Sequence, residues 1–369
     1  MMVKTRVLVL GPIPPPVGGV ETVTKAILES RAFERFEVTH CDLTKGRKKE
    51  TQGKIDFGNV RWAIIHFARM MRSMSLLQPH VVYMPVAAKW AGFWRDMVLA
   101  WIAKRSGAKL VGHIHGPKFA DILAKKGVIG SVTRARLDQF DVLLVLGTAW
   151  KDLFEGYGYR GQVSVVPSTL TREFFEVANA FERKYESENP VGLFVGQVGH
   201  RKGVFDLLEV LHRLKAAGQP AKVMIVGAPE YSGEWDKLMR RRDELAVNDV
   251  AEFVGPLQGE ALYECFRQAS YFVLPSYREG LPVVFFEAAA FELPVIATPV
   301  GVSADLLKHE HNCLLINPGN VEEIANAIKR MRASVSERKQ YARQLKKDIE
   351  RYHPDNVCGL IADIITGMV

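Results

Sequence analysis

The sequence predicts an α/β protein of two domains, each built on a doubly wound parallel sheet. Its 369 residues exceed what one hydrophobic core usually organises, and 48% of them are hydrophobic. Short apolar, β-rich segments alternate with helical patterns along most of the chain. The alternation stops once, in a polar stretch over residues 174–190, and then restarts. We therefore expect two domains facing a central cleft, with a ligand beyond the carboxyl ends of the strands.

The first domain is expected to cover residues 1–175. It opens with an apolar strand, a loop rich in glycine and proline, and a helix, at residues 3–10, 11–19 and 21–29. Later apolar runs predict strands at residues 81–84, 109–113, 142–146 and 163–166. Most of these runs have helical patterns between them, which is typical of βαβ units.

The second domain is expected to cover residues 176–350. Apolar runs predict strands at residues 191–195, 221–226, 250–254, 271–274 and 294–297. Helical patterns lie at residues 203–217, 235–246, 259–269, 282–291, 321–332 and 336–352. Residues 351–369 are expected to form a C-terminal helix that packs back on the first domain.

Cysteine usage and hydropathy narrow the class of protein. The four cysteines are far apart and lack metal-ligand spacing, which indicates free thiols in a reducing compartment. The apolar run near the N-terminus is too short for a signal peptide, and we find no stretch of about 18 apolar residues for a membrane span. A cytoplasmic protein is the expectation.

The charge is uneven along the chain. Residues 1–180 hold 26 Lys and Arg against 15 Asp and Glu, a net +11, whereas residues 181–369 hold 23 against 26, a net −3. This asymmetry suits an anionic partner of the first half, such as a membrane, a nucleic acid or an acidic substrate. A solvated basic face is the alternative.

Two glutamates frame the helix predicted at residues 282–291. Glu279 stands at the end of a strand, and Glu287 follows eight residues later, close to the same helix face. Apolar residues surround Glu287 on both sides in the sequence, and an ionised carboxylate there calls for a partner. Backbone amides at Gly280 and Leu281, at the helix start, would favour phosphate or a developing anion.

This segment resembles the E-x7-E motif of retaining glycosyltransferases of the GT4 type, which have the GT-B architecture of two Rossmann-like domains. The likeness extends over most of the chain, and residues 294–298 continue it. It implies that Glu279 lies near the donor sugar and its phosphate. It implies that Glu287 binds the ribose hydroxyls of the nucleotide.

The stretch from Gly196 to Gly203 resembles the diphosphate-binding loop of that family. Lys202 takes the place of the family's lysine, while Gln197 stands where an arginine is usual. A departing diphosphate needs cations where its charge develops, and Lys202 before a helix start meets that need. Arg201 could supply the missing charge, or Gln197 could donate a neutral hydrogen bond.

The first domain offers a glycine loop and two histidines. Gly18 and Gly19 precede the first helix and would let backbone amides approach an anion, but they do not form the G-x-G-x-x-G pattern of a dinucleotide site. His113 and His115 lie two residues apart at a strand end and project to the same side. The resemblance implies that the glycines reach the diphosphate and that His115, with His113 in reserve, lies beside the donor sugar.

The resemblance adds the remaining donor contacts. Gly227 and Val254 end strands where the family's backbone holds ribose and base. The turn at residues 298–305 is similar to a Gly-Gly-x-Pro-Glu turn but keeps only Gly301 and has Asp305 for the glutamate. No metal and no other cofactor is expected.

Two helical stretches of the first domain combine apolar, aromatic and basic residues. Residues 60–77 carry Arg61, Arg69 and Arg72 on one stripe, and residues 88–105 carry three tryptophans beside lysines and arginines. Such a pattern suits an anionic membrane surface, although a buried helix whose arginines reach solvent would show it too.

The sequence therefore predicts transfer of a sugar from a UDP- or GDP-linked donor to a hydroxyl acceptor, with retention. His115, Lys202 and Glu279 are the predicted catalytic residues, and a lipid-linked glycan at the cytoplasmic face of the membrane is the predicted acceptor. A non-catalytic subunit that binds nucleotide sugar is the alternative. A nucleic-acid partner is not expected, because no basic helix has base-reading spacing.

Overall fold

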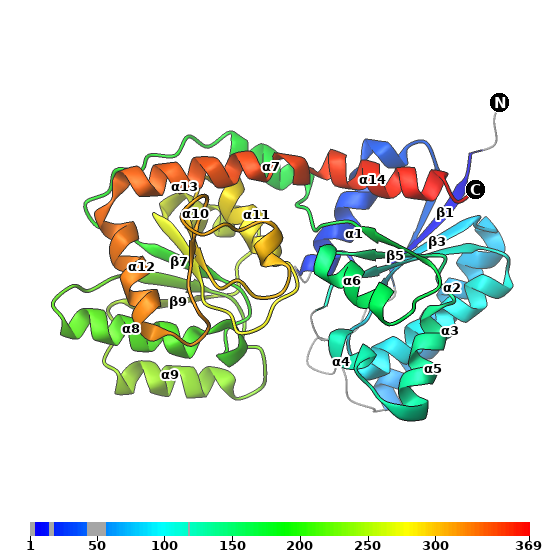
Figure 1. Cartoon of the computed structure of the whole chain (residues 1–369), viewed down its shortest axis with the longest axis horizontal. Coiled ribbons are helices and arrows are strands. Elements are labelled where there is room, and N and C mark those ends of the chain that lie inside the picture. The colour runs from blue at the N-terminus through cyan, green and yellow to red at the C-terminus, as the bar shows by residue number, and fades with distance from the viewer. Residues whose placement is uncertain (1–3, 15–17, 43–56, 117–118) are drawn as a thin grey trace. The chain divides into compact units, whose positions relative to one another are not determined.

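The computed structural model describes residues 4–14, 18–42, 57–116 and 119–369, with the backbone alone for residues 57–64 and 66. The chain divides into two compact units. Unit 1 comprises residues 1–172 and 352–369, and unit 2 comprises residues 173–351. The C-terminal segment therefore belongs to the same unit as the N-terminus (Figure 1).

Unit 1 contains a six-stranded parallel sheet in the order β2-β1-β3-β4-β5-β6. Its strands are β1 (Arg6–Leu10), β2 (Glu37–Cys41), β3 (Val81–Val86), β4 (Lys109–Ile114), β5 (Val142–Val145) and β6 (Gln162–Val165). The central strands are almost wholly apolar because helices cover parallel sheets on both faces. The strand order reverses between β1 and β3, so loops that follow these strands diverge there.

The helices of unit 1 are α1 (Gly19–Glu29), α2 (Phe57–Leu77), α3 (Trp90–Arg105), α4 (Phe119–Leu123), α5 (Gly127–Leu137), α6 (Thr148–Gly156) and α14 (Pro354–Thr366). Figure 1 shows α2 and α3 on one side of the sheet and α1 and α14 on the other. Helix α14 packs on α1 and on the short 3-10 helix at Arg31–Phe33. Thr169 Oγ1 donates a hydrogen bond to the Tyr352 carbonyl at 2.7 Å, which fastens the returning chain.

Unit 2 contains a second six-stranded parallel sheet, in the order β12-β11-β10-β7-β8-β9. Its strands are β7 (Gly192–Val195), β8 (Val223–Val226), β9 (Ala251–Gly255), β10 (Tyr271–Leu274), β11 (Val295–Ala297) and β12 (Leu314–Leu315). The order reverses between β7 and β10, which pair directly. Ligands of open α/β sheets bind at such a reversal.

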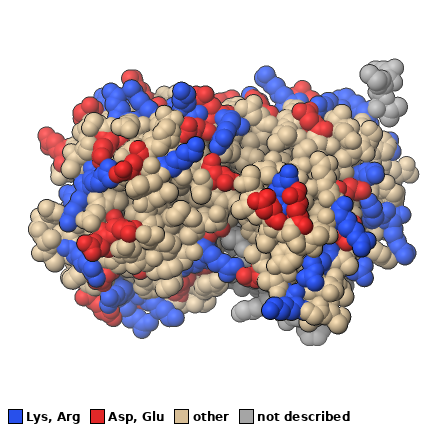
Figure 2. Space-filling model, in the orientation of Figure 1, with Lys and Arg blue, Asp and Glu red and all other residues tan. Residues whose placement is uncertain are grey.

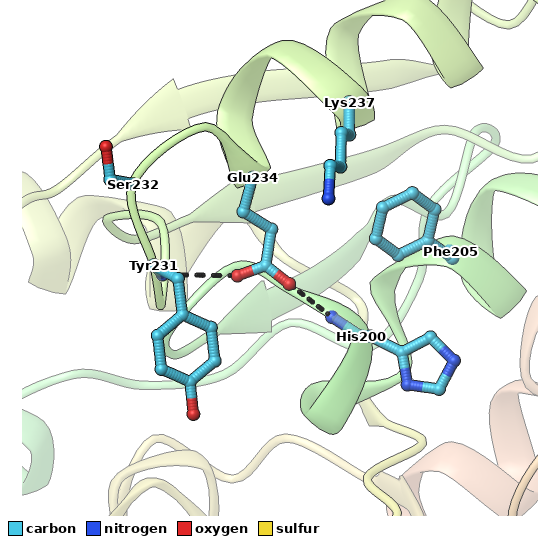
Figure 3. Close-up of a pocket in the computed structure, with 6 residues that line it drawn as sticks. All are labelled: His200, Phe205, Tyr231, Ser232, Glu234 and Lys237. Atoms are coloured by element: carbon cyan, nitrogen blue, oxygen red, sulfur yellow. Dashed lines mark hydrogen bonds between the residues drawn. The ribbon is translucent and has the colours of Figure 1, made fainter.

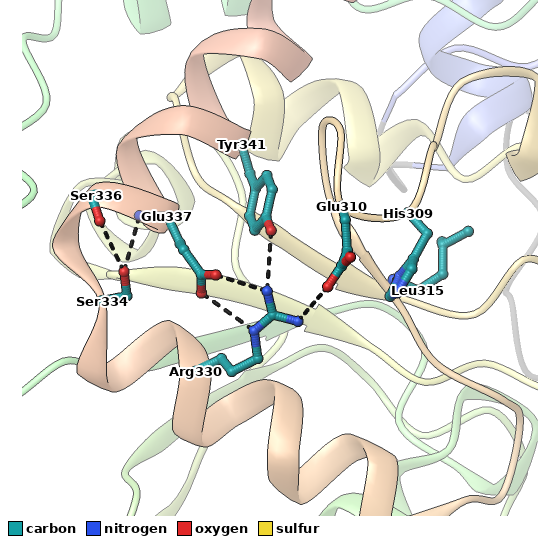
Figure 4. Close-up of polar contacts among 8 residues, drawn as sticks. All are labelled: His309, Glu310, Leu315, Arg330, Ser334, Ser336, Glu337 and Tyr341. Carbon is teal, nitrogen blue, oxygen red and sulfur yellow. Dashed lines mark hydrogen bonds and ion pairs between the residues drawn. The ribbon is translucent and has the colours of Figure 1, made fainter.

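The helices of unit 2 are α7 (Arg172–Asn179), α8 (Val204–Ala216), α9 (Glu234–Glu244), α10 (Glu260–Gln268), α11 (Val283–Ala290), α12 (Val321–Ala333) and α13 (Val335–Asp348). Short 3-10 helices lie at His200–Lys202, Ser303–Asp305 and Glu350–Tyr352. Arg330 ties the closing helices together: it pairs with Glu337 and Glu310 and hydrogen-bonds Tyr341 (Figure 4).

The predicted linker at residues 174–190 differs from its expected role as a loose connection. Phe174 packs edge-on against Tyr263 and Phe291 of unit 2, with ring centroids 5.1 and 5.5 Å apart. The buried guanidinium of Arg183 donates to four backbone carbonyls of unit 2, including Phe291 O at 2.8 Å and Ala269 O at 2.6 Å. Alternating polar and aromatic residues hid this anchoring from the sequence pattern.

The predicted α/β class and the doubly wound sheets are confirmed. Two strands were missed, the edge strand β2 and the two-residue β12. All four cysteines are free and buried, as their spacing indicates. Within the described part of the chain, no helix has the length and apolar character to cross a bilayer.

Candidate active site

The clearest cluster of charge in unit 2 lies where the strand order reverses. Lys202 ends the loop after β7, and Glu279 lies in the loop after β10. Both side chains are buried, and Lys202 Nζ is 2.5 Å from Glu279 Oε1. The loop lysine and the first motif glutamate, 77 residues apart, are thus direct partners.

Arg201 extends this cluster through a network that the sequence did not reveal. Its Nε donates to Glu230 Oε1 at 2.6 Å, and its two terminal nitrogens donate to Gln197 Oε1 and the Arg278 carbonyl, each at 3.0 Å. Arg201 Nη1 lies 3.7 Å from Glu279 Oε1. The guanidinium of Arg201 therefore occupies the space beside Gln197, where the resembling family has an arginine of its own.

Two glycines let backbone segments approach closely at this edge of the sheet. A Cβ on Gly227 would lie 1.7 Å from the Gly196 carbonyl oxygen, and Gly227 has a φ of +146°. A Cβ on Gly301, whose φ is +67°, would lie 2.3 Å from the Glu279 carbonyl oxygen. Only glycine fits at these points, so Gly301 supports the backbone that carries Glu279 and Gly280.

Glu287 is buried on α11 among apolar side chains. Burial raises the pKa of this carboxyl to about 7. Across the described chain its side chain has no hydrogen bond and no ion pair. A buried carboxyl without a partner is costly, which makes it a candidate for binding a ligand hydroxyl.

The other predicted donor-site residues of unit 2 lie near strand ends or the start of α11. Gly280 and Leu281 are buried just before α11, and Val254 is exposed near the end of β9. Asp305 lies in a 3-10 helix, and its carbonyl accepts a hydrogen bond from Arg351 at 3.2 Å.

A pocket of about 250 Å³ borders the loop at residues 196–203, which resembles a diphosphate-binding loop (Figure 3). Six residues line it: His200, Phe205, Tyr231, Ser232, Glu234 and Lys237. The Glu234 carboxylate accepts hydrogen bonds from the His200 and Tyr231 amides, at 3.0 and 3.2 Å. Glu234 therefore holds the start of the segment that presents Arg201 and Lys202.

The histidines of unit 1 form a buried pair at the end of β4. The rings of His113 and His115 have centroids 3.9 Å apart, and the Tyr83 hydroxyl lies 2.7 Å from His113 Nδ1. Both ring nitrogens of His115 are buried and lack a hydrogen-bond partner within the described chain. Burial lowers the pKa of His115 to about 4 and that of His113 well below its usual value.

The glycine pair of unit 1 starts a helix. Helix α1 begins at Gly19, and Gly18 is its extended N-cap residue, whose carbonyl accepts the Thr22 amide at 2.9 Å. A Cβ on Gly18 would meet the Glu21 carboxylate. The N-terminal amides of α1 are of the kind that can bind an anion.

The sequence led us to expect no metal site, and it predicted membrane-type features on two helical stretches. The described residues contain no group of three His, Cys, Asp or Glu that could hold a metal ion. On α3, Trp90 and Trp101 are partly exposed, and Arg105 lies over the Trp101 ring at 4.3 Å from its centroid. Arg69 and Arg72 are exposed on α2, whereas the side chain of Arg61 lies outside the described part.

The structure thus brings Arg201, Lys202 and Glu279 together and places His115 against His113. Sequence reasoning missed Glu230, the partner of Arg201. The one signal was its place four residues after the end of β8, at the ligand-binding edge of the sheet.

A comparison with known families finds a match within unit 2. Residues 178–348 match the model of the family described as glycosyl transferases group 1. Unit 2 is therefore similar to the group 1 glycosyltransferases over most of its length. The matched region contains all the predicted site residues of unit 2.

Curated glycosyltransferases resemble this chain over part of its length. An uncharacterised glycosyltransferase of Methanocaldococcus jannaschii is 26% identical over 205 residues, which is 53% of this chain and 52% of that protein. A PP-undecaprenol-glycan alpha-1,4-N-acetyl-D-galactosaminyltransferase of Campylobacter jejuni is 32% identical over 195 residues, 51% of this chain and 49% of that protein. The chain spans about half the length of these relatives.

Solved structures resemble the whole chain. Sucrose-phosphate synthase of Thermosynechococcus elongatus has a TM-score of 0.77 at 15% identity and covers 99% of each chain. An E. coli trehalose-6-phosphate protein bound with UDP-2-fluoro glucose has a TM-score of 0.74 at 12% identity, again over 99% of each chain. These likenesses confirm the GT-B architecture of the chain.

Proposed function

We propose that the chain is a retaining glycosyltransferase that moves a sugar from a nucleotide diphosphate donor to a hydroxyl acceptor. The observation that carries this proposal is the convergence of Lys202, Arg201 and Glu279 where the strand order of unit 2 reverses. Two cations and a carboxylate at that edge suit a diphosphate next to a sugar.

When the donor binds, its diphosphate would partly replace two carboxylates as the partner of the two cations. In the proposed complex, Lys202 and Arg201 turn part of their contact from Glu279 and Glu230 toward the phosphate oxygens. This leaves the Glu279 carboxylate free to bind hydroxyls of the sugar. Because the two cations neutralise the leaving group, we propose that the donor is used without a metal ion or other cofactor.

Glu287 is proposed to bind the ribose hydroxyls. Its buried carboxyl has no hydrogen bond or ion pair among the described side chains, so hydroxyl donors of a ribose would satisfy it. Gly227 and Val254, at the ends of β8 and β9, are proposed to hold the ribose and base through their backbone.

His115, together with the amides at Gly18 and Gly19, is the proposed contribution of unit 1. The unpartnered ring nitrogens of His115 would orient the sugar, and the amides of the α1 N-terminus would stabilise the departing diphosphate. In the transfer step, the bond from the anomeric carbon to the phosphate oxygen breaks. The acceptor oxygen bonds to that carbon on the same face, and its proton passes to the leaving phosphate.

The acceptor is proposed to be a lipid-linked glycan at the cytoplasmic face of the membrane, in cell-surface polysaccharide synthesis. The name of the Campylobacter jejuni relative contains PP-undecaprenol, which supports an acceptor of this class. The E. coli structure contains a UDP sugar analogue, which supports a UDP-linked donor. Partly exposed tryptophans beside basic residues on α3 suit a membrane surface.

A donor panel tests the proposal. UDP-, GDP- and ADP-sugars should be screened for a rise in the melting temperature, because a ligand that binds only the folded chain stabilises it. One donor class should stabilise the native chain, and Glu287→Ala should abolish that stabilisation. Stabilisation without hydrolysis or transfer would favour the non-catalytic subunit, and no stabilisation by any donor would contradict the proposal.

A further inference from the structure

Helix α5 of unit 1 exposes a ridge of apolar side chains. Val128 is 80% exposed, Ile129 56% and Val132 40%, whereas Gly130, Thr133 and Leu137 on the opposite face are buried. The exposed residues Val128, Ile129 and Val132 lie one, three and four positions apart, so they share one face of the helix. Clustered apolar residues that project this far into solvent are typical of a surface that another phase or partner covers.

The surroundings of this ridge are basic. Between Asp121 and Asp138 the chain contains four Lys and Arg residues and no Asp or Glu. Lys125, Lys126 and Arg136 are exposed. Figure 2 shows blue atoms over the part of unit 1 that Figure 1 draws as α2, α3 and α5. Two lysines before a helix start oppose the helix dipole, so local stability does not account for them.

The turn before α5 is built to hold these lysines beside the apolar ridge. Gly127 has a φ of +65°, and a Cβ on Gly130 would lie 1.9 Å from the Lys125 carbonyl oxygen. The close approach of Lys125 to the helix therefore requires glycine at residue 130. Lys125 Nζ also lies 6.0 Å from the centroid of the Trp90 ring, which is itself partly exposed.

We propose that α5 docks on an anionic lipid bilayer. Val128, Ile129 and Val132 enter the boundary between headgroups and acyl chains, and Lys125, Lys126 and Arg136 pair with lipid phosphates. Charge complementarity selects this occupant, because a basic rim around an apolar ridge matches an anionic surface with an apolar interior. The inference rests on the proposed function only in that docking would bring the chain to a lipid-linked acceptor.

Vesicle cosedimentation of the full chain tests this docking. Vesicles of phosphatidylcholine with 30% phosphatidylglycerol, on the order of a typical anionic content, are compared with pure phosphatidylcholine. The native chain should bind the anionic vesicles at least tenfold more tightly. Val128→Asp/Ile129→Asp should abolish this binding, and Lys125→Ala/Lys126→Ala should weaken it about 30-fold, since each basic residue contributes ~1 kcal/mol near such a surface.

Matched variants separate docking from general effects. Leu360→Asp places a charge on α14, at another exposed apolar residue of unit 1, and Lys339→Ala/Lys347→Ala removes two exposed charges of α13. Both should bind vesicles as the native chain does, with unchanged melting temperatures for all variants. Equal binding to neutral vesicles, native binding by Val128→Asp/Ile129→Asp, or self-association through α5 in light scattering would overturn the proposal.

The outcome of the vesicle experiment does not depend on the proposed transferase activity. Vesicle binding requires neither donor nor acceptor, and donor stabilisation of the melting temperature requires no vesicles. Loss of vesicle binding with intact donor stabilisation would reject α5 docking alone. Intact vesicle binding without donor stabilisation would reject the transferase function alone.

Discussion

The two units treat the buried ionisable groups of their candidate sites in different ways. In unit 2, Lys202 and Arg201 already contact carboxylates, so a ligand would exchange one ionic partner for another. In unit 1, His115 is buried with both ring nitrogens unpartnered within the described chain. The difference teaches that the cluster around Lys202 in unit 2 is organised around charge, whereas His115 in unit 1 offers neutral hydrogen-bonding groups.

Among the changes that test this contrast, removal of Lys202 is expected to have the largest effect on transfer activity. Lys202→Ala deletes the cation nearest Glu279 and the proposed stabiliser of the departing diphosphate. Transfer should fall about 100- to 1000-fold, the range for loss of one preorganised electrostatic group. The measurement is kcat/KM with the donor identified by thermal stabilisation.

The control for this variant is Lys222→Ala, which removes an exposed lysine paired with Glu252 in the same unit. It should transfer sugar at the native rate. Lys202→Arg should recover part of the lost activity, because it restores the charge with a different shape. Full activity of a folded Lys202→Ala chain would contradict the charge-centred description of unit 2.

Arg201 provides the next largest expected effect. It contacts Gln197, the residue that stands where an arginine is usual in the resembling family. Arg201→Ala should lower kcat/KM about 10- to 100-fold, less than Lys202→Ala because Arg201 lies farther from Glu279. Gln197→Arg combined with Arg201→Ala should recover most of this loss.

Failure of that rescue in a folded double variant would show that Arg201 acts on Glu230 and the loop rather than on the diphosphate. Glu230→Gln offers a second measurement, since it keeps the size of the side chain and removes its charge. If Glu230 orients Arg201, this change should raise the KM for the donor more than it lowers kcat.

The two units also differ in how much of their structure the sequence could predict. Strands such as β7 and β10 were predicted because parallel, doubly covered strands form continuous apolar runs. Strand β2 was missed because Glu37–Cys41 mixes polar with apolar residues and forms no continuous apolar run. The strand lies at the edge of the sheet of unit 1. The motif spacing placed Lys202 and Glu279 in one site, but it could not predict Glu230, whose contact depends on the path of the loop after β8.

Side-chain exposure was harder to predict than secondary structure. Apolar residues in a helical pattern usually indicate the buried face, so Val128 and Ile129 gave no reason to expect a surface ridge. The segment at residues 174–190 was interpreted from its polarity, but Phe174 and Arg183 contact residues more than 80 positions later. Long-range partners of this kind leave no periodic signal in a single sequence.

Glu287 should give unit 2 a stability that falls as the pH rises. Burial raises its pKa to about 7 from a usual value of 4.5, so the folded chain retains a proton that the unfolded chain releases between these values. Stability is then highest below about pH 4.5 and is lost by up to ~3 kcal/mol as the pH rises through 7. Glu287→Gln should therefore melt higher than the native chain at pH 8 and yet bind the donor more weakly.

Thermal melts of both chains across this pH range measure the effect. Glu252→Gln, at an exposed residue of β9, is the matched control and should leave the pH profile unchanged. An unaltered profile in Glu287→Gln would show that the carboxyl is ionised in the folded state and partnered in another way.

His115 should give unit 1 the opposite dependence, with a smaller effect at accessible pH. Burial lowers its pKa to about 4 from 6.5, so the unfolded chain binds more protons between these values. The stability that the neutral ring confers is complete above pH 6.5 and falls with the pH, by ~2 kcal/mol at pH 5. His115→Asn should remove this part of the acid sensitivity.

Tryptophan fluorescence can measure this effect selectively, because five of the six tryptophans lie in unit 1. The melting temperature at pH 5 relative to pH 7 should drop less in His115→Asn than in the native chain. His353→Asn, at a partly exposed histidine that caps α14, is the control and should keep the native drop. Equal drops in all three chains would show that His115 carries no pH-linked stability, and the proposed contrast between the units would then rest on unit 2 alone.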